Sequence, residues 1–355
     1  MTRITLLLTL LLGAVFAAQA QSAGSGAPSP SPEALAMEQA HAAAGQAYSR
    51  RLAGALAADG GARELAFAAI LRRIAAADAV AAAPPPGDAP SARVPPDPAV
   101  ERWLDAAATR AGADVLANQL LIAAGDASAQ TLRAQAAQRW QAAEPGNLAP
   151  LLWQSIPADA LLADARRASH ADTRMYEGIR WIAAAYRRHP PDAAERAALA
   201  GDGDFDEAEF AAMSAMALWT AIAMPALRPL MEACRGDALQ ATATRRADCR
   251  NVALLLAERS DALVLRHAGL GLLQATAIDS HSRAEAEARQ RRMDWQMLQW
   301  GEVARRQERD GAAQFVRLLA DPAIDTEQQL VERVLAEAGV PLDPPPGWVS
   351  PWRRR

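Results

Sequence analysis

The chain contains no lysine, so all 37 of its basic side chains are arginine. This absence excludes three kinds of chemistry that depend on a lysine amine. A P-loop places a lysine on the bound phosphates, and pyridoxal or other Schiff-base enzymes attach a carbonyl carbon to one. Penicillin-recognising enzymes need a lysine three residues after their nucleophilic serine. We therefore expect none of these activities.

The other familiar signatures of catalysis are also missing. The five histidines include no HExxH motif and no pair four residues apart, so a zinc hydrolase is not supported. The chain has no G-x-S-x-G elbow for a hydrolase nucleophile and no glycine-rich dinucleotide loop after a strand. The sequence therefore predicts no catalytic residue, no cofactor or cofactor-binding residue, and no metal ligand.

Aromatic side chains make up only 5% of the chain, although hydrophobic residues make up 51%. The predicted core is therefore built from alanine, leucine, valine and methionine around a few tryptophans. With 41 acidic residues against 37 basic ones, the net charge is −4, and the one basic cluster is Arg353–Arg355 at the chain end. A mildly acidic chain of this kind is a poor candidate for binding nucleic acid.

The first twenty residues have the three parts of a secretory signal. Arg3 gives a basic start, Ile4–Phe16 is an apolar run, and Ala18-Gln19-Ala20 is a small-x-small cleavage site. We interpret residues 1–20 as a cleaved signal peptide, and the alternative is a membrane anchor. The signal predicts an exported protein that works in the periplasm or is secreted.

A second uncharged stretch, Phe210–Leu227, is long enough to be considered as a membrane span. Its many alanines, together with Ser214, Thr220 and Pro225, lower its hydropathy. We interpret it as a central helix that is buried within the protein. No stable membrane span is therefore expected after signal cleavage.

The chain has two cysteines, Cys234 and Cys249. An even number of cysteines in an exported protein favours a disulfide, and the alternative is two buried free thiols. A cross-link that closes about fifteen residues stabilises the folded chain by roughly 3 kcal/mol if it acts by restricting the unfolded chain. A zinc site is not expected, because no further ligands lie at suitable spacing.

Helical patterns punctuated by proline and glycine run through the chain, and no window alternates polar and apolar residues in the manner of a strand. We therefore predict an all-α protein without a sheet, in which antiparallel helical hairpins stack. Asp59-Gly60-Gly61 marks the turn of the first hairpin. The predicted organisation is a signal peptide (1–20), a disordered leader (21–32), an N-terminal helical hairpin (33–82), a proline-rich linker (83–98), a main helical-repeat domain (99–340) and an extended C-terminal tail (341–355).

Two segments share a helix that runs into a proline turn. Residues 136–147 end in Glu144-Pro145-Gly146-Asn147, and residues 183–190 repeat the pattern more weakly up to Pro190. This pattern resembles the end of a tetratricopeptide repeat, although the two prolines are 45 positions apart rather than about 34. The wider chain is similar to exported helical-repeat proteins rich in alanine and arginine. The resemblance implies a solenoid whose concave face holds peptides, and the alternative is an irregular helical array.

Three acids in the segment 202–206 have the spacing of the first three ligands of a calcium loop. The glycine and the final glutamate that such a loop requires are replaced by Glu207 and Met213. We interpret the acids instead as favourable charges at the start of the helix that follows.

Methionine and tryptophan form a stripe along a predicted helix over 283–309, and the tail carries two more tryptophans. The stripe is either a groove that binds a partner or part of the core. The residues predicted to contact a partner are Met293, Met297, Trp300, Trp348 and Trp352. The predicted function is a non-catalytic scaffold or binding protein for a protein or peptide. The alternative is a cell-envelope hydrolase that cleaves glycans with unidentified carboxylates.

Overall fold

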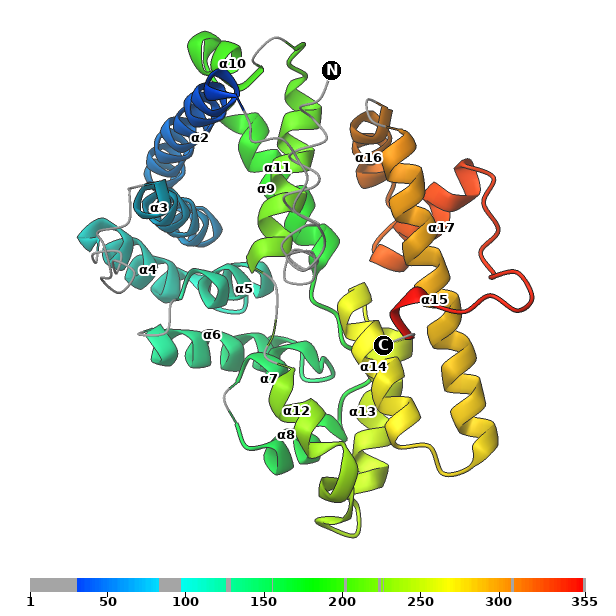
Figure 1. Cartoon of the computed structure of the whole chain (residues 1–355). Coiled ribbons are helices and arrows are strands. Elements are labelled where there is room, and N and C mark those ends of the chain that lie inside the picture. The colour runs from blue at the N-terminus through cyan, green and yellow to red at the C-terminus, as the bar shows by residue number, and fades with distance from the viewer. Residues whose placement is uncertain are drawn as a thin grey trace. The chain divides into compact units, whose positions relative to one another are not determined.

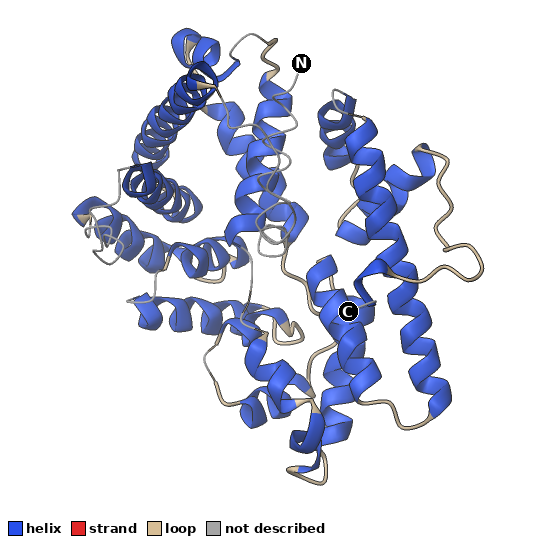
Figure 2. Cartoon of the chain, in the orientation of Figure 1, coloured by secondary structure: helices blue, strands red, loops and turns tan. Residues whose placement is uncertain are grey.

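The structure, a computed structural model, describes residues 31–82, 97–125, 129–154, 156–200, 203–222, 225, 227–307 and 310–353. All the regular structure in these residues is helical (Figures 1 and 2). Their only β-type pairing consists of two isolated bridges, Asn147 with His170 and Ala171 with Ser260. The prediction of an all-α fold without a sheet is confirmed.

Three predicted segments lie wholly or largely outside the described residues: the signal peptide (1–20), the leader as far as residue 30 and the linker as far as residue 96. The helices that follow the leader and the linker both begin at a proline, α2 at Pro32 and α4 at Pro98. The backbone N–H of Ala99 donates to the side chain of Asp97 at 2.9 Å, which caps α4. Proline suits a first helical position because it has a fixed φ and lacks an N–H group that would be left unpaired there.

In the described parts of the chain, no helix combines the length and apolar character needed to cross a membrane. Much of the uncharged stretch forms α11 (Glu207–Ile222), which buries Ala211, Ala215 and Trp219. The backbone N–H groups of the second and third residues of α11 both donate to Asp206 Oδ1 at 2.8 Å. For Asp206, the interpretation as an acid at a helix start is confirmed.

Backbone contacts divide the chain into two compact units. The unit that we call the aromatic unit contains the described residues of 31–140 and 181–215. The other, which we call the disulfide unit, contains the described residues of 141–180 and 216–353. The chain passes from one unit to the other within α6 (Gln130–Ala143), α9 (Met175–Arg188) and α11.

The aromatic unit begins with an antiparallel hairpin of α2 (Pro32–Asp59) and α3 (Ala62–Ala82). The hairpin turns at Gly60, whose φ of 73° is a left-handed conformation that glycine adopts without steric cost. The helices that pack against this hairpin are α4 (Pro98–Ala111) and α5 (Val115–Ala124), on α3, and α10 (Ala193–Ala200), on α2 (Figure 1).

Aromatic rings from distant parts of the sequence form the core of this unit. Phe67 of α3 packs edge-on against Trp181 and Tyr186 of α9, with ring centroids 5.7 and 6.2 Å apart. The same cluster also contains Tyr48, Phe205 and Phe210. Phe67 is fully buried. Aromatic pairs in this geometry add to the stabilisation that burial of their area already provides.

The α-helices of the disulfide unit range from 5 to 27 residues in length. Besides the first part of α9 and the end of α11, it contains α7 (Ala149–Trp153), α8 (Ala158–Ala165), α12 (Arg228–Ala233), η2 (Gly236–Gln240), α13 (Arg245–Arg259), α14 (Leu263–Ala275), α15 (Ser280–Arg306), α16 (Asp310–Ala320), α17 (Glu327–Glu337) and η3 (Pro351–Arg353). Packing runs from α8 to α13, then to α14 and α15, and from α15 to α17.

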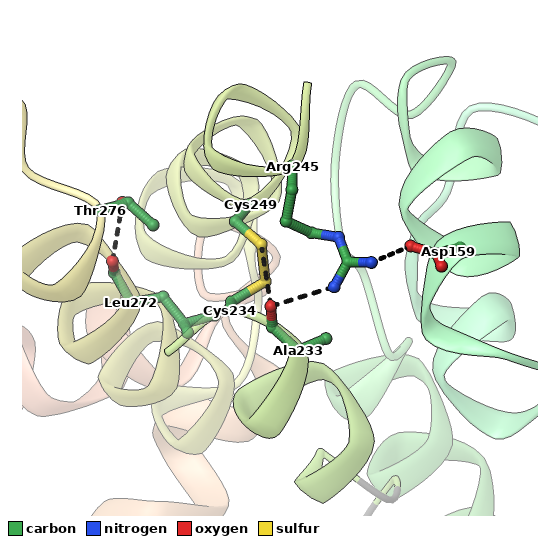
Figure 3. The surroundings of a disulfide bond; sticks show 7 residues. All are labelled: Asp159, Ala233, Cys234, Arg245, Cys249, Leu272 and Thr276. Atoms are coloured by element: carbon green, nitrogen blue, oxygen red, sulfur yellow. Dashed lines mark hydrogen bonds and ion pairs between the residues drawn. A yellow bond between two sulfur atoms is a disulfide. The ribbon is translucent and has the colours of Figure 1, made fainter. Parts of the chain in front are cut away.

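Cys234, which ends α12, and Cys249 of α13 form a disulfide with their Cα atoms 5.6 Å apart. The predicted bridge is therefore confirmed, and both cysteines are fully buried. Beside the bridge, Arg245 donates to the carbonyl oxygen of Ala233 at 3.3 Å and forms an ion pair with Asp159 of α8 (Figure 3). The bridge and this arginine together hold α12 and α8 to α13.

Candidate functional site

Three loops of the disulfide unit meet at the start of α9. The segment 169–174 before α9 lies beside Asn147 on one side and beside Ser260 on the other. Its backbone is bonded to both neighbours: Leu148 N donates to His170 O at 2.8 Å, and Ala171 N donates to Arg259 O at 3.0 Å. The turn of the tetratricopeptide-like segment is part of this junction.

Asp261, from the turn between α13 and α14, caps the start of α9. Its Oδ1 accepts the backbone N–H of Thr173 at 2.8 Å, and its Oδ2 accepts the Thr173 hydroxyl at 2.9 Å and the Met175 N–H at 3.0 Å. The first N–H groups of a helix have no partner within the helix, and they favour a negative charge. Asp261 supplies that partner from a segment 88 positions away.

Asp172 lies beside Asp261 and accepts the remaining N–H of the same stretch, that of Arg174, at 2.7 Å. Burial raises the pKa of Asp261, which is 5% exposed. The neighbouring Asp172 raises this pKa further, through its charge and through a hydrogen bond that two carboxyl groups can share only when one is protonated. Although the bonds from Thr173 and Met175 oppose these effects, the pKa of Asp261 reaches about 7.

Arg174 adopts a left-handed backbone conformation with φ of 55°, alone among the described residues other than glycine. Such a conformation costs on the order of 1–3 kcal/mol and persists only where surrounding contacts impose it. The Arg174 guanidinium forms ion pairs with Glu144 and with Asp172, the latter at 3.6 Å. These contacts hold the strained residue between the two acids.

A second acid, Glu327 at the start of α17, caps a different helix. Its Oε2 accepts the backbone N–H of Leu263, the first residue of α14, at 2.6 Å, and its own N–H donates to Asp261 O at 2.9 Å. Burial of the carboxyl group raises the pKa of Glu327. The junction therefore uses one acid to begin α9 and another to begin α14.

Tyr176 and Arg180 of α9 also lie at this junction. Tyr176 is 1% exposed, and its hydroxyl has no hydrogen-bond partner among the described residues. Burial raises the pKa of Tyr176 above its usual range. Arg180 donates to the carbonyl oxygens that follow α16, at Asp321 and Ile324, as well as to Leu319.

This cluster does not have the arrangement of a glycan-cleaving site. The paired acids of glycosidases leave room between them for the sugar or for water, whereas Asp261 is only 5% exposed. Both oxygens of Asp261 are also occupied by Thr173 and Met175. We interpret the acids as parts of the fold.

The sequence did not reveal this cluster. Ser260-Asp261-Ala262 directly precedes the apolar helix α14, so Asp261 has the local signature of a cap for its own helix. In the structure it caps α9 instead. Only the left-handed backbone at Arg174 and the burial of the acids, which require the tertiary structure, identify the junction.

The five residues predicted to contact a partner differ in exposure. Met293 is buried at 7% exposed, while Met297 and Trp300 are half-buried along α15. Trp348 is half-buried against Trp295, with ring centroids 5.5 Å apart and the rings nearly perpendicular. Trp352 is exposed at 43%. The five do not form one exposed surface.

The tail forms a second candidate site. It is held along α15, where Trp295 Nε1 donates to Pro341 O at 2.9 Å and Arg292 pairs with Asp343 at 3.2 Å. Ser350 is 1% exposed, yet the side chains on either side of it, Val349 and Trp352, are exposed. The tail thus presents apolar side chains from a docked backbone.

Comparisons of this chain with family models, curated proteins and solved structures found no match. The resemblance to tetratricopeptide repeats therefore stays a prediction.

Proposed function

We propose that this protein is a non-catalytic binding protein for a protein or peptide partner, and that it works after export from the cytoplasm. The tail is the observation that carries the binding role. Exposed large apolar side chains are few in the described residues, and they are Val264, Ile278, Val349 and Trp352. Two of these four lie three positions apart in the tail.

The docked tail is suited to binding because its backbone is already ordered. Trp348 packs on Trp295, and Ser350 is buried between Val349 at 53% exposed and Trp352 at 43% exposed. Ordering a surface in advance reduces the entropy lost when a partner binds. Tryptophan is also among the residues that contribute most to binding energy at protein interfaces.

The charge next to these side chains indicates the chemistry of the partner. Arg353, Arg354 and Arg355 follow Trp352 directly, in a chain whose net charge is −4. Complementary charges give an interface its specificity and speed its formation. The favoured partner segment therefore carries carboxylates next to an apolar side chain.

Two observations support export. The first twenty residues have the pattern of a secretory signal. Both cysteines are joined in a disulfide, and disulfides persist mainly in oxidising compartments. Sequencing the N-terminus of the protein from a cell-envelope fraction tests this part: we expect a start close to Gln21. A chain that retains Met1 and stays in the cytoplasm would contradict it.

A photocrosslinking amino acid at position 349 tests the binding role in the full chain. Incubation with cell-envelope extract should give one discrete adduct that is lost in the Trp352→Ala variant and weakens at high salt. Ile278, at 70% exposed, is the matched control position, because no arginine cluster follows it. The same adducts from both positions, or none from position 349, would contradict the proposal.

A further inference from the structure

Three consecutive backbone N–H groups point at the acid pair where the segment before α9 meets the turn between α13 and α14. Thr173 N and Met175 N donate to Asp261, and Arg174 N, between them, donates to Asp172. The left-handed backbone at Arg174 is what turns these groups toward the acids. The two carboxyl groups thus accept bonds from consecutive residues of one short stretch of backbone, which places them next to each other.

We propose that the Asp172–Asp261 carboxyl pair is a proton-dependent latch that fixes the start of α9 to the turn between α13 and α14. With one proton on the pair, the two groups share a hydrogen bond and keep all three N–H bonds. Without that proton, two negative charges face each other in a buried site, which disfavours their close approach. Loss of the proton therefore loosens the start of α9.

The charged groups around the pair place the proton on Asp261. On the loop before α9, Asp172 is paired with the Arg174 guanidinium, which also binds Glu144 at the end of the α6 turn. Titratable groups from three helices also lie near this site: Tyr176 and Arg180 on α9, Glu327 on α17, whose N–H donates to Asp261 O, and Arg266 on α14, which donates to Ser260 O at 3.4 Å. Since Arg180 and Arg266 donate to backbone carbonyl oxygens and Glu327 adds no positive charge, no hydrogen bond or ion pair in the described part of the chain joins a cation to the Asp261 carboxyl group.

The direction of the pH effect follows from the two states of Asp261. An exposed aspartate in an opened chain has a pKa of about 4, while the folded pKa is about 7. The folded state therefore binds the proton more tightly. The stabilisation is complete below about pH 4 and is lost as the pH rises toward 7. The latch is closed in acid, loosens as the pH rises from about 4 to about 7, and stays loose above neutrality.

Hydrogen exchange of the full chain at pH 5.5 and pH 8.0 tests the latch. For peptides covering 169–180, we expect the protection factor, which is corrected for the intrinsic exchange rate, to be about thirtyfold lower at pH 8.0 than at pH 5.5. Asp261→Asn keeps an acceptor oxygen but cannot lose a proton, so its protection should be nearly equal at both pH values. Equal protection in the unaltered protein, or an unchanged pH dependence in Asp261→Asn, would overturn the proposal.

One further variant serves as a control for this experiment, and a second replaces Asp261→Asn if needed. Asp279→Asn makes the same substitution at an exposed cap of α15, and it should leave the pH dependence of 169–180 unchanged. If Asp261→Asn does not fold, Asp172→Asn takes its place. In Asp172→Asn the fall in protection between pH 5.5 and pH 8.0 should be smaller than in the unaltered protein, because the charge and the shared hydrogen bond that raise the proton affinity of Asp261 are gone. A fall of unchanged size in Asp172→Asn would exclude the pair as the latch.

Discussion

The aromatic unit and the disulfide unit reach a packed core by different means. The aromatic unit gathers six rings from four segments of the chain, centred on Phe67, Tyr186 and Phe210. In the disulfide unit, the only ring pair among the described residues is Trp295 with Trp348. Each unit has eight aromatic residues among those described, so the units differ in whether the rings pack on one another and not in how many rings they contain.

The disulfide unit is stabilised instead by a covalent bridge and by side chains that cap helices. The Cys234–Cys249 bridge joins α12 to α13, and Asp261 and Glu327 begin α9 and α14. Packed rings stabilise the fold in proportion to the apolar area that they bury, and this area changes little when a ring moves slightly. A disulfide or a buried helix cap, in contrast, is lost when one of its bonded atoms is removed. We therefore expect the two units to respond differently to substitution, redox conditions and pH.

The largest effect is expected from Phe67→Ala in the aromatic unit. Removing a fully buried phenylalanine costs roughly 3–5 kcal/mol, from lost burial and from the cavity left behind. Phe67→Leu, which retains most of the volume, should cost less than about 1.5 kcal/mol. Urea unfolding followed by hydrogen exchange in α3 measures both. Equal losses in the two variants would show that the rings do not carry this core.

The double variant Cys234→Ala/Cys249→Ala tests the corresponding support of the disulfide unit. With the cysteines 15 positions apart, we expect a loss of about 3 kcal/mol. Protection should fall in α13 and α14 and stay unchanged in α3. A comparable fall in α3 would break the distinction between the two units.

Gly178→Ala tests close packing within the disulfide unit. A Cβ added at this position of α9 would overlap the ring of Trp219, which is 2% exposed. Overpacking of this kind costs about 1–3 kcal/mol. Gly271→Ala in α14 is the matched control, since nothing lies within 4 Å of its Cβ. It should stabilise by about 0.5–1 kcal/mol, because alanine favours a helix over glycine. Thermal unfolding that moves in the same direction for both variants would contradict this account.

The smallest effect is expected in the tail. Trp348→Ala removes a half-buried ring from Trp295, which should cost about 1–2 kcal/mol and lower the melting temperature by a few degrees. Trp352→Ala removes an exposed ring and should leave the melting temperature nearly unchanged. Equal shifts from the two tryptophans would show that the tail does not dock through Trp348.

Local features were the ones that the sequence predicted well. The first hairpin turns at Gly60 as its Asp-Gly-Gly signal indicates, and Asp206 caps α11 as an acid at a helix start. The two cysteines pair because they were the only two available. The stripe on α15 is partly core, since its Met293 is buried, and the sequence had left that choice open.

The sequence by itself determined that the chain is helical, where several helices start and turn, and which cysteines pair. These outcomes depend on residues close together in the chain or on a single available partner. Only the tertiary structure decided that Asp261 caps α9, that Asp172 lies beside it, and that Val349 and Trp352 stay exposed. Such outcomes depend on which distant segments meet, because burial and the nearness of a second charge set a carboxyl group's proton affinity, and neither is a property of the residue alone.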